Sequence, residues 1–259
     1  MEDVAWFRSA LQGTQCGMAW LLSPEPEPQP QHQALPTVPE LVREFKGQGL
    51  ESLLAALELT EEQRLAIQTA TVGQRTNPQW QRHRQGRLTA SNIGAVLSRR
   101  SASTCASLMK RLLGGQNLDG VKAFQQACQV EVLDCGLSVS KSGILGASPD
   151  GFVGPSALLE VKCPYSQRNS TIAEAVEVPS FCLFVEGQGY ALKKTHAYWH
   201  QVQGQLHLTD RDLSYFVVWT TKEALVIPIP KDPAWGQNLV VLEVFYRQHI
   251  LPVLISRED

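Results

Sequence analysis

The spacing of apolar residues changes part-way along this chain of 259 residues. In the first part, apolar residues recur with the 3.6-residue period of helices. A helix is predicted to begin at Thr60, whose hydroxyl can cap it, with Leu65 and Ile67 among its buried residues. Two more helices are predicted, one from Thr89 or Ser91 and one over residues 103–113.

Beyond Gly136 the apolar residues follow the two-residue period of strands, with Gly- and Pro-containing turns between them. Strands are predicted over residues 137–140, 144–148, 157–163, 214–221 and 224–230. Helices are predicted over about residues 195–208 and from Trp235 to about Ile255. This order predicts an α/β (α+β) fold in which helices flank one central mixed sheet.

Residues 24–40 are rich in Pro, Glu and Gln, a composition that extends the chain and cannot build a core. We therefore expect residues 1–58 to form an acidic, Pro-rich extension and residues 59–259 to form one domain. No stretch reaches the roughly 18 consecutive apolar residues of a membrane span, and no basic segment precedes an apolar one at the N-terminus. The six cysteines include no CxxC pair. These features predict an intracellular protein that is not secreted, with no membrane partner and no structural disulfide.

Charge is distributed unevenly along the chain, although the net charge is only -2. Residues 63–118 carry nine Lys or Arg side chains and no carboxylate, and eight of the nine are arginines. The arginine fork binds phosphate oxygens in pairs, so this segment suits a polyanion such as DNA. A basic surface that only keeps the protein soluble is the alternative interpretation of the charge alone.

Two carboxylates and a lysine form the sharpest candidate site. Glu160 and Lys162 are two residues apart on a predicted strand and point to the same face, which we expect to line a cleft. Asp150, in the turn sequence SPDG, lies one short hairpin earlier and can come beside Glu160. Two close carboxylates repel unless a cation lies between them, and hard oxygen ligands suit Mg2+. The set predicts metal-assisted hydrolysis of a phosphodiester, with a plain β-turn and a solvated salt bridge as the structural alternatives.

The acid followed by E-x-K on the next strand resembles the core of PD-(D/E)XK nucleases. Four longer strings, QRHRQGRLTASNIG, LGASPDGFV, LLEVKCPYS and YWHQVQGQL, resemble the YqaJ-like viral recombinase branch of that superfamily, to which phage lambda exonuclease belongs. The resemblance runs over about residues 59–255 in consistent order. It implies a restriction-endonuclease-like core and a DNA nuclease that uses Mg2+, or Mn2+ in its place. Such an enzyme would degrade one strand of duplex DNA from a 5'-phosphorylated end, in recombination or repair.

Motif by motif, the resemblance implies roles for individual residues. The implied metal ligands are Asp150, Glu160 and the carbonyl of Val161, and the implied catalytic residues are Asp150, Glu160, Lys162 and Gln201. The residues implied to hold the terminal 5'-phosphate are Arg84, Ser91, Ser148 and Arg168. Arginine forks and serine hydroxyls are, independently of the family, the donors that a terminal phosphate needs. A helix N-cap at Ser91 and a polar helix face at Gln201 are the structural alternatives.

One family feature is missing from the stretch DGVKAFQQACQVEVLDCG, which lacks the G-x-x-x-E motif whose Glu adds a carboxylate to the metal site. Glu131 is a poor substitute, because it lies at a predicted strand entrance. Fewer acids weaken metal binding, so a catalytically weakened protein that binds DNA ends is the alternative function. A recombination scaffold whose N-terminal extension recruits a partner is a third.

Other features are less specific. The resemblance also implies a homo-oligomer, and both nucleus and mitochondrion stay open as locations. A zinc site is the weaker interpretation of three histidines on one predicted helix, because no cysteine stands at ligand spacing. These histidines are His196, His200 and His207.

Overall fold

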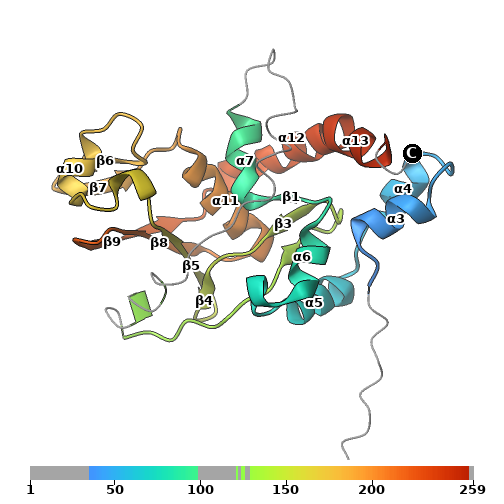
Figure 1. The fold of residues 1–259 in the computed structure, drawn as a ribbon, viewed down its shortest axis with the longest axis horizontal. Coiled ribbons are helices and arrows are strands. Elements are labelled where there is room, and N and C mark those ends of the chain that lie inside the picture. Colours follow the sequence, from blue (N-terminus) through green and yellow to red (C-terminus); the bar gives the residue numbers. More distant parts are fainter. Residues whose placement is uncertain (1–34, 99–120, 122–123, 126–128, 257–259) are drawn as a thin grey trace, which may run out of the picture. The chain divides into compact units, whose positions relative to one another are not determined.

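The computed structural model describes residues 35–98, 121, 124–125 and 129–256, where helices and sheets are mixed (Figure 1). The strands are β1 (Leu88–Thr89), β2 (Ser138–Val139), β3 (Leu145–Ala147), β4 (Gly151–Val153), β5 (Ala157–Lys162), β6 (Leu183–Glu186), β7 (Gly189–Leu192), β8 (Leu213–Trp219) and β9 (Ala224–Pro230). They form a four-stranded sheet in the order β4-β5-β8-β9, a three-stranded sheet in the order β1-β3-β2, and the β6-β7 hairpin. The predicted α/β class is confirmed, but the strands are divided among three sheets where the sequence predicted one. The β6-β7 hairpin has no counterpart among the predicted strands.

The helices are α3 (Val38–Glu44), α4 (Leu50–Leu57), α5 (Glu61–Ala70), α6 (Pro78–Arg84), α7 (Ala90–Leu97), α10 (Ile172–Val176), α11 (Ala197–Thr209), α12 (Gln237–Phe245) and α13 (Leu251–Ser256). Shorter helical turns are η1 (Gln74–Thr76), η2 (Tyr165–Gln167), η3 (Pro233–Gly236) and the π-helical η4 (Tyr246–Ile250). The helix predicted from Thr60 is α5, which a capping box formed by Thr60 and Gln63 begins. Ile67 is buried as predicted, whereas Leu65 is 61% exposed. The helix predicted over residues 103–113 lies outside the described residues.

β5 lies at the centre of the four-stranded sheet. It pairs antiparallel with β4 and parallel with β8, which in turn pairs antiparallel with β9. All six residues of β5 are buried. Leu159 and Val161 face one apolar cluster, whereas Leu158, on the opposite face, belongs to a cluster that includes Val202 of α11. Because side chains alternate along a strand, the charged pair of the E-x-K motif lies on the face that α11 covers.

Two glycines let α11 approach α7 closely. A Cβ on Gly94 of α7 would lie 2.5 Å from the Cα of Ala197, at the start of α11. A Cβ on Gly204 of α11 would lie 2.6 Å from Cδ1 of Ile93. At Gly94 the neighbouring atom is backbone, so only glycine fits there, whereas at Gly204 the side chain of Ile93 would have to move. The close contact at Gly94 sets the spacing of the two helices and with it the place of α11 against the sheet.

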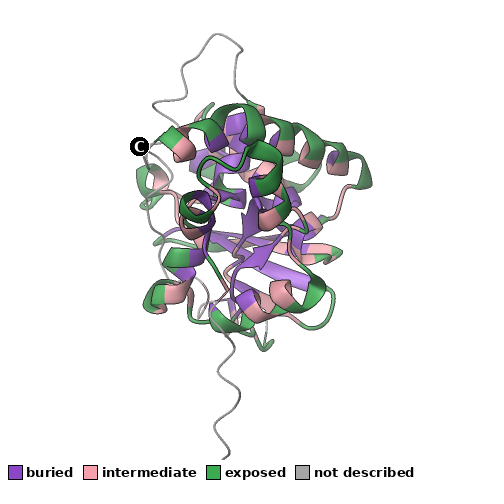
Figure 2. Cartoon of the chain, turned by 90° about the vertical axis from the view of Figure 1, so that its right-hand side faces the viewer, coloured by how far each residue is buried: buried purple, intermediate pink, exposed green. Residues whose placement is uncertain are grey.

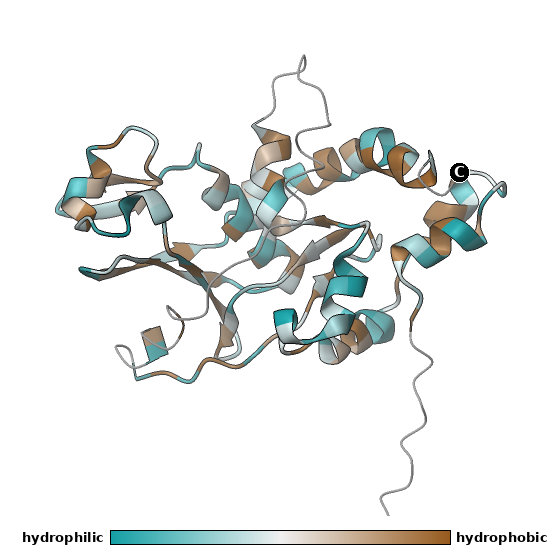
Figure 3. Ribbon diagram, viewed as in Figure 1, coloured by the Kyte–Doolittle hydropathy of each residue, from teal (hydrophilic) through white to brown (hydrophobic). Residues whose placement is uncertain are grey.

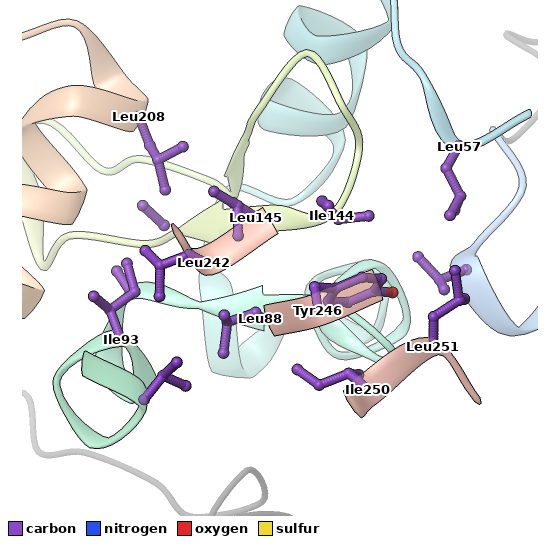
Figure 4. Close-up of a cluster of buried hydrophobic side chains, with 14 of the residues drawn as sticks. Leu57, Leu88, Ile93, Ile144, Leu145, Leu208, Leu242, Tyr246, Ile250 and Leu251 are labelled. Carbon is purple, nitrogen blue, oxygen red and sulfur yellow. The ribbon is translucent and has the colours of Figure 1, made fainter. Parts of the chain in front are cut away.

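A second apolar core, distinct from the two clusters that pack on the four-stranded sheet, joins helices from both ends of the described chain (Figure 4). Leu57 of α4 and Tyr246 of η4 are fully buried with Leu88 of β1, and the Tyr246 hydroxyl donates to the carbonyl of Gly86 at 2.6 Å. Figure 2 shows the buried residues in purple, gathered on the strands and on the inner sides of the helices. The compact unit begins at Pro36. The domain boundary predicted at residue 58 is therefore too late, because α3 and α4 belong to the domain.

Within the described ranges, the stretch Pro233–Ser256 is long and apolar enough to cross a membrane by length and composition (Figure 3). It is the closing helix predicted from the sequence, made of η3, α12, η4 and α13. One such helix is weak evidence for a membrane span, because core helices pass the same test. Here Trp235, Leu242 and Leu251 enter the second apolar core, while Val240 is 66% exposed.

Candidate active site

The charged pair of the E-x-K motif is enclosed. Lys162 Nζ lies 2.5 Å from Glu160 Oε1, and the two side chains are only 5% and 1% exposed. The prediction that this pair lines a cleft is wrong for both residues, because α11 covers their face of the sheet. The burial means that protein groups, and not water, must satisfy both charges.

Two glutamines of α11 satisfy the carboxylate. Gln201 Nε2 donates to Glu160 Oε1 at 2.6 Å, and Gln201 Oε1 accepts from Lys162 Nζ at 3.0 Å. Gln205 Nε2 donates to Glu160 Oε2 at 2.6 Å. Residues four apart lie on one helix face, which is why both glutamines reach the same carboxylate. The family resemblance implied a role for Gln201 and not for Gln205, although the four-residue spacing of the two glutamines is visible in the sequence.

The lysine in this network stays protonated. Burial alone would lower the pKa of Lys162, but the charge of Glu160 and its hydrogen bond outweigh burial, so the pKa is raised above its ordinary value. The ring of Tyr198 lies beneath the ammonium, with Nζ 4.7 Å from the ring centroid. A group held as an ammonium can stabilise negative charge and donate hydrogen bonds, but it cannot accept a proton.

Asp150 reaches the same strand from the preceding turn. Its backbone N–H donates to the carbonyl of Leu159 at 2.9 Å, and its Oδ2 accepts the backbone N–H of Val161 at 2.7 Å. Burial, and then the neighbouring charge of Glu160, raise the pKa of Asp150 to about 7, although the hydrogen bond from Val161 opposes the shift. The predicted neighbourhood of the two acids is therefore present, and each feels the charge of the other.

Two of the predicted phosphate ligands are linked through a tryptophan. The guanidinium of Arg84 lies 4.0 Å from the ring centroid of Trp80 in α6, and the Trp80 indole N–H donates to Ser148 Oγ at 2.8 Å. Burial, and then the charge of Arg75, lower the pKa of Arg84 to about 10, which still leaves it charged at neutral pH. Ser148 stands two residues before Asp150. The link therefore places an arginine close to the acidic part of the site.

The other two predicted phosphate ligands have only local partners. Ser91 Oγ lies 3.2 Å from the hydroxyl of Thr89 and 3.4 Å from the amide nitrogen of Asn92. Thr89, and not Ser91, is the N-cap of α7. The guanidinium of Arg168 lies over the ring of Tyr165, just beyond β5. Among the described residues, no hydrogen bond, ion pair or ring contact joins Ser91 or Arg168 to Arg84, so the predicted convergence of the four stays a prediction.

The histidines of α11 have structural partners. His196 caps the helix by accepting the backbone N–H of Tyr198, and His200 accepts the indole N–H of Trp235. His207 pairs with the backbone carbonyl of Asp232. Each histidine therefore has a use inside the fold that needs no metal.

Comparison with known proteins identifies the segment that contains the acids, the lysine and both glutamines. Residues 118–212 match the profile of the YqaJ-like viral recombinase domain. Over this segment the chain is therefore similar to the YqaJ-like viral recombinase domain. The matched range includes the hairpin of Asp150 and all of α11, whereas Arg84 and Ser91 lie upstream of it.

The chain is also similar to two viral alkaline nucleases. It is 28% identical over 195 residues to the alkaline nuclease of Orgyia pseudotsugata multicapsid polyhedrosis virus, an alignment of 65% of this chain and 46% of that protein. It is 27% identical over 196 residues to the alkaline nuclease of Autographa californica nuclear polyhedrosis virus, covering 65% and 47%. The chain thus spans about half the length of these relatives.

The fold also has a solved counterpart. The crystal structure of the Shutoff and Exonuclease Protein from Kaposi's sarcoma associated herpesvirus superimposes with a TM-score of 0.54 at 12% identity. The match covers 83% of this chain and 81% of that one. At this identity the likeness shows a shared fold, and it confirms the predicted architecture.

The donors of the candidate active site fit a hard divalent cation. Asp150 Oδ1 has no hydrogen-bond partner among the described residues, and the charge of Glu160 is what raises the pKa of Asp150 after burial. A cation beside both acids would relieve that repulsion, and carboxylate oxygens are the ligands that Mg2+ prefers. The described residues hold no group of three or more His, Cys, Asp or Glu that could bind a metal, and Glu131 is exposed. The fit is therefore to an ion that keeps several waters.

Proposed function

We propose that this chain is a Mg2+-dependent DNA nuclease. The observation that carries the proposal is the juxtaposition of Asp150 with the buried pair of Glu160 and Lys162, inside the segment that matches the YqaJ-like domain. The relationship to viral alkaline nucleases supports the same class of reaction.

Asp150, Glu160 and the carbonyl of Val161 would hold the ion, and Mn2+ would suit the same oxygen ligands. The ion would supply Lewis-acid polarisation of the scissile phosphate. Lys162, held as an ammonium, stabilises charge that develops on the phosphate, while Gln201 fixes the position of both Glu160 and Lys162.

The proposed substrate is the 5'-phosphorylated end of duplex DNA, degraded from 5' to 3' in recombination or repair. Arg84 remains charged and lies on Trp80, which donates a hydrogen bond to Ser148 near the acids. Arg84 and the hydroxyl of Ser148, which Trp80 links, would together bind the terminal phosphate. A phosphate monoester carries close to two charges, so an arginine favours it over a 5'-hydroxyl.

One observation favours a second function, the binding of DNA ends without turnover. Both oxygens of Glu160 are already hydrogen-bonded, to Lys162, Gln201 and Gln205, and they can bind an ion only by sharing or exchanging these partners. A protein of this kind would hold DNA ends in a recombination complex, with the N-terminal extension of the chain as the surface that recruits a partner.

The two functions separate in one experiment. A duplex with a 5'-phosphate, labelled at either end, is incubated with the full chain and Mg2+, with Asp150→Asn as the matched control. The proposed function predicts nucleotides released from the 5' end by the wild type and not by the control. Release from the 3' end or internal cuts would overturn the proposed polarity, and binding without cleavage would establish the second function.

A further inference from the structure

Tyr165 is the most exposed of the large hydrophobic side chains in the described part of the chain, with 78% of its surface open to solvent. It opens η2, three residues after Lys162. Three residues of extended chain reach at most about 10 Å, so the ring starts within roughly that distance of the lysine backbone. The ring is open to solvent at this place, and the guanidinium of Arg168 packs against it.

Arg168 holds the ring in place from one side. Its guanidinium carbon lies 4.0 Å from the ring centroid, and Nη1 donates to the backbone carbonyl of Tyr165 at 2.7 Å. The carbonyl of Arg168 accepts the backbone N–H of Thr221 at 2.7 Å, which ties this turn to the loop between β8 and β9. Since Arg168 covers one face of a ring that keeps 78% of its exposure, the other face is open.

We propose that Tyr165 and Arg168 form a nucleobase-stacking subsite for an unpaired nucleotide of the DNA substrate. An aromatic ring that is already fixed by a guanidinium offers a flat surface at a small cost in side-chain entropy. Every base has a π-face, so such a surface accepts any base without reading sequence. The N–H groups of Arg168 that do not bond Tyr165 are left to meet the phosphate of the same nucleotide. The identity of the ligand rests on the proposed function of the neighbouring acids.

The place of the pair indicates which nucleotide it holds. β5 delivers Lys162 to the acids and continues directly into η2, so the stacked base belongs to a nucleotide next to the scissile phosphate. A base bound there has left the duplex stack. The subsite would therefore help to open the DNA end as well as bind it.

The test measures binding without turnover. The affinity of the full chain for a 5'-phosphorylated duplex is measured by fluorescence anisotropy in EDTA, with an abasic residue at the first, second or third nucleotide from the 5' end. The subsite predicts that one abasic position weakens binding to the wild type by about 5- to 100-fold, the range expected for loss of one base–aromatic stack.

Substitutions at position 165 assign the effect to the ring. Tyr165→Phe keeps the discrimination against the abasic DNA, and Tyr165→Leu, which keeps bulk but has no ring, loses it. Val240→Ala is the control for an exposed apolar side chain on another element, and it binds as the wild type does. Discrimination that survives Tyr165→Leu overturns the subsite.

The outcomes also separate the subsite from the nuclease. Base discrimination that depends on Tyr165, in a protein that cleaves nothing with Mg2+, supports the subsite and overturns the proposed turnover. Cleavage by a protein in which Tyr165→Leu changes no affinity overturns the subsite alone. A wild type that binds no DNA overturns both.

Discussion

Because Glu160 and Lys162 are enclosed, we expect removal of either one to lower the free energy of unfolding far more than removal of one partner of a solvated pair. The Lys162→Met variant leaves a buried carboxylate with two amide donors, and the Glu160→Gln variant leaves a buried ammonium without its counter-ion. The double variant, Glu160→Gln with Lys162→Met, removes both charges. The side-chain amide at position 160 can then accept from Gln201 and donate to Gln205 Oε1, a buried atom that has no hydrogen-bond partner among the described atoms.

The magnitude follows from the burial. Breaking a buried ion pair by removing one partner costs about 3–5 kcal/mol, because the remaining charge stays in the protein interior. Each single variant should therefore lower the free energy of unfolding by about 3 kcal/mol, a large share of the roughly 5–15 kcal/mol of a typical domain. The double variant should lose only about 1–2 kcal/mol, since no unpaired charge remains.

The assay is urea unfolding of the full chain, followed by far-UV circular dichroism, in a double-mutant cycle. Lys222→Met is the matched control, because Lys222 pairs with Glu174 at 3.1 Å while both side chains are about half exposed, at 47% and 59%. Loss of that solvent-screened surface pair should cost much less than loss of either partner of the buried pair. Two results would show that the pair is open to solvent and not enclosed. One is a double variant whose loss in free energy of unfolding equals the sum of the two single losses, and the other is single losses that each stay within about 0.5 kcal/mol.

Three further outcomes are expected. Because a proton on Asp150, whose pKa is raised to about 7, competes with the ion, Mg2+ affinity measured by calorimetry should be constant well above that pH and fall by up to about tenfold per pH unit below it. An affinity that does not change down to about pH 5.5 would contradict a role for Asp150 as a ligand. Arg84→Ala should slow cleavage of 5'-phosphorylated duplex by about ten- to a hundredfold and of 5'-hydroxyl duplex much less, measured as a ratio of initial rates. Equal losses on both ends would show that Arg84 does not sense the phosphate. The affinity of the full chain for duplex DNA should fall steeply between about 50 and 200 mM salt, and a flat dependence would show that the clustered arginines do not touch the DNA backbone.

Local rules predicted much of the fold. The start of α5 follows from the cap at Thr60, and the strands of the site follow from their two-residue period. The start of α7 was predicted at Thr89 or Ser91, and the helix has Thr89 as its N-cap residue. The common face of Glu160 and Lys162 follows from the same period. The capping, turn and alternation signals act over a few residues, so one sequence is enough to find them.

The enclosure of the site depends on contacts between distant segments. The period of β5 does not say which face a helix covers, and α11 takes that place because Gly94 lets it pack close to α7. The link from Arg84 through Trp80 to Ser148 likewise joins two motifs far apart in the sequence. The early helices α3 and α4 were assigned to the extension because the Pro-rich segment precedes them, although their apolar residues complete the second core.

The central claim is that Asp150 and Glu160 hold the ion on which cleavage depends. The most direct test is a Mg2+ titration of 5'-phosphorylated duplex cleavage by wild type and Asp150→Asn, with duplex binding measured on the same samples in EDTA. The expected result is saturable cleavage by the wild type, no cleavage by Asp150→Asn at any Mg2+ concentration, and DNA affinities within a fewfold of each other. Cleavage by Asp150→Asn at the wild-type rate, or wild-type cleavage that persists in EDTA, would contradict the claim.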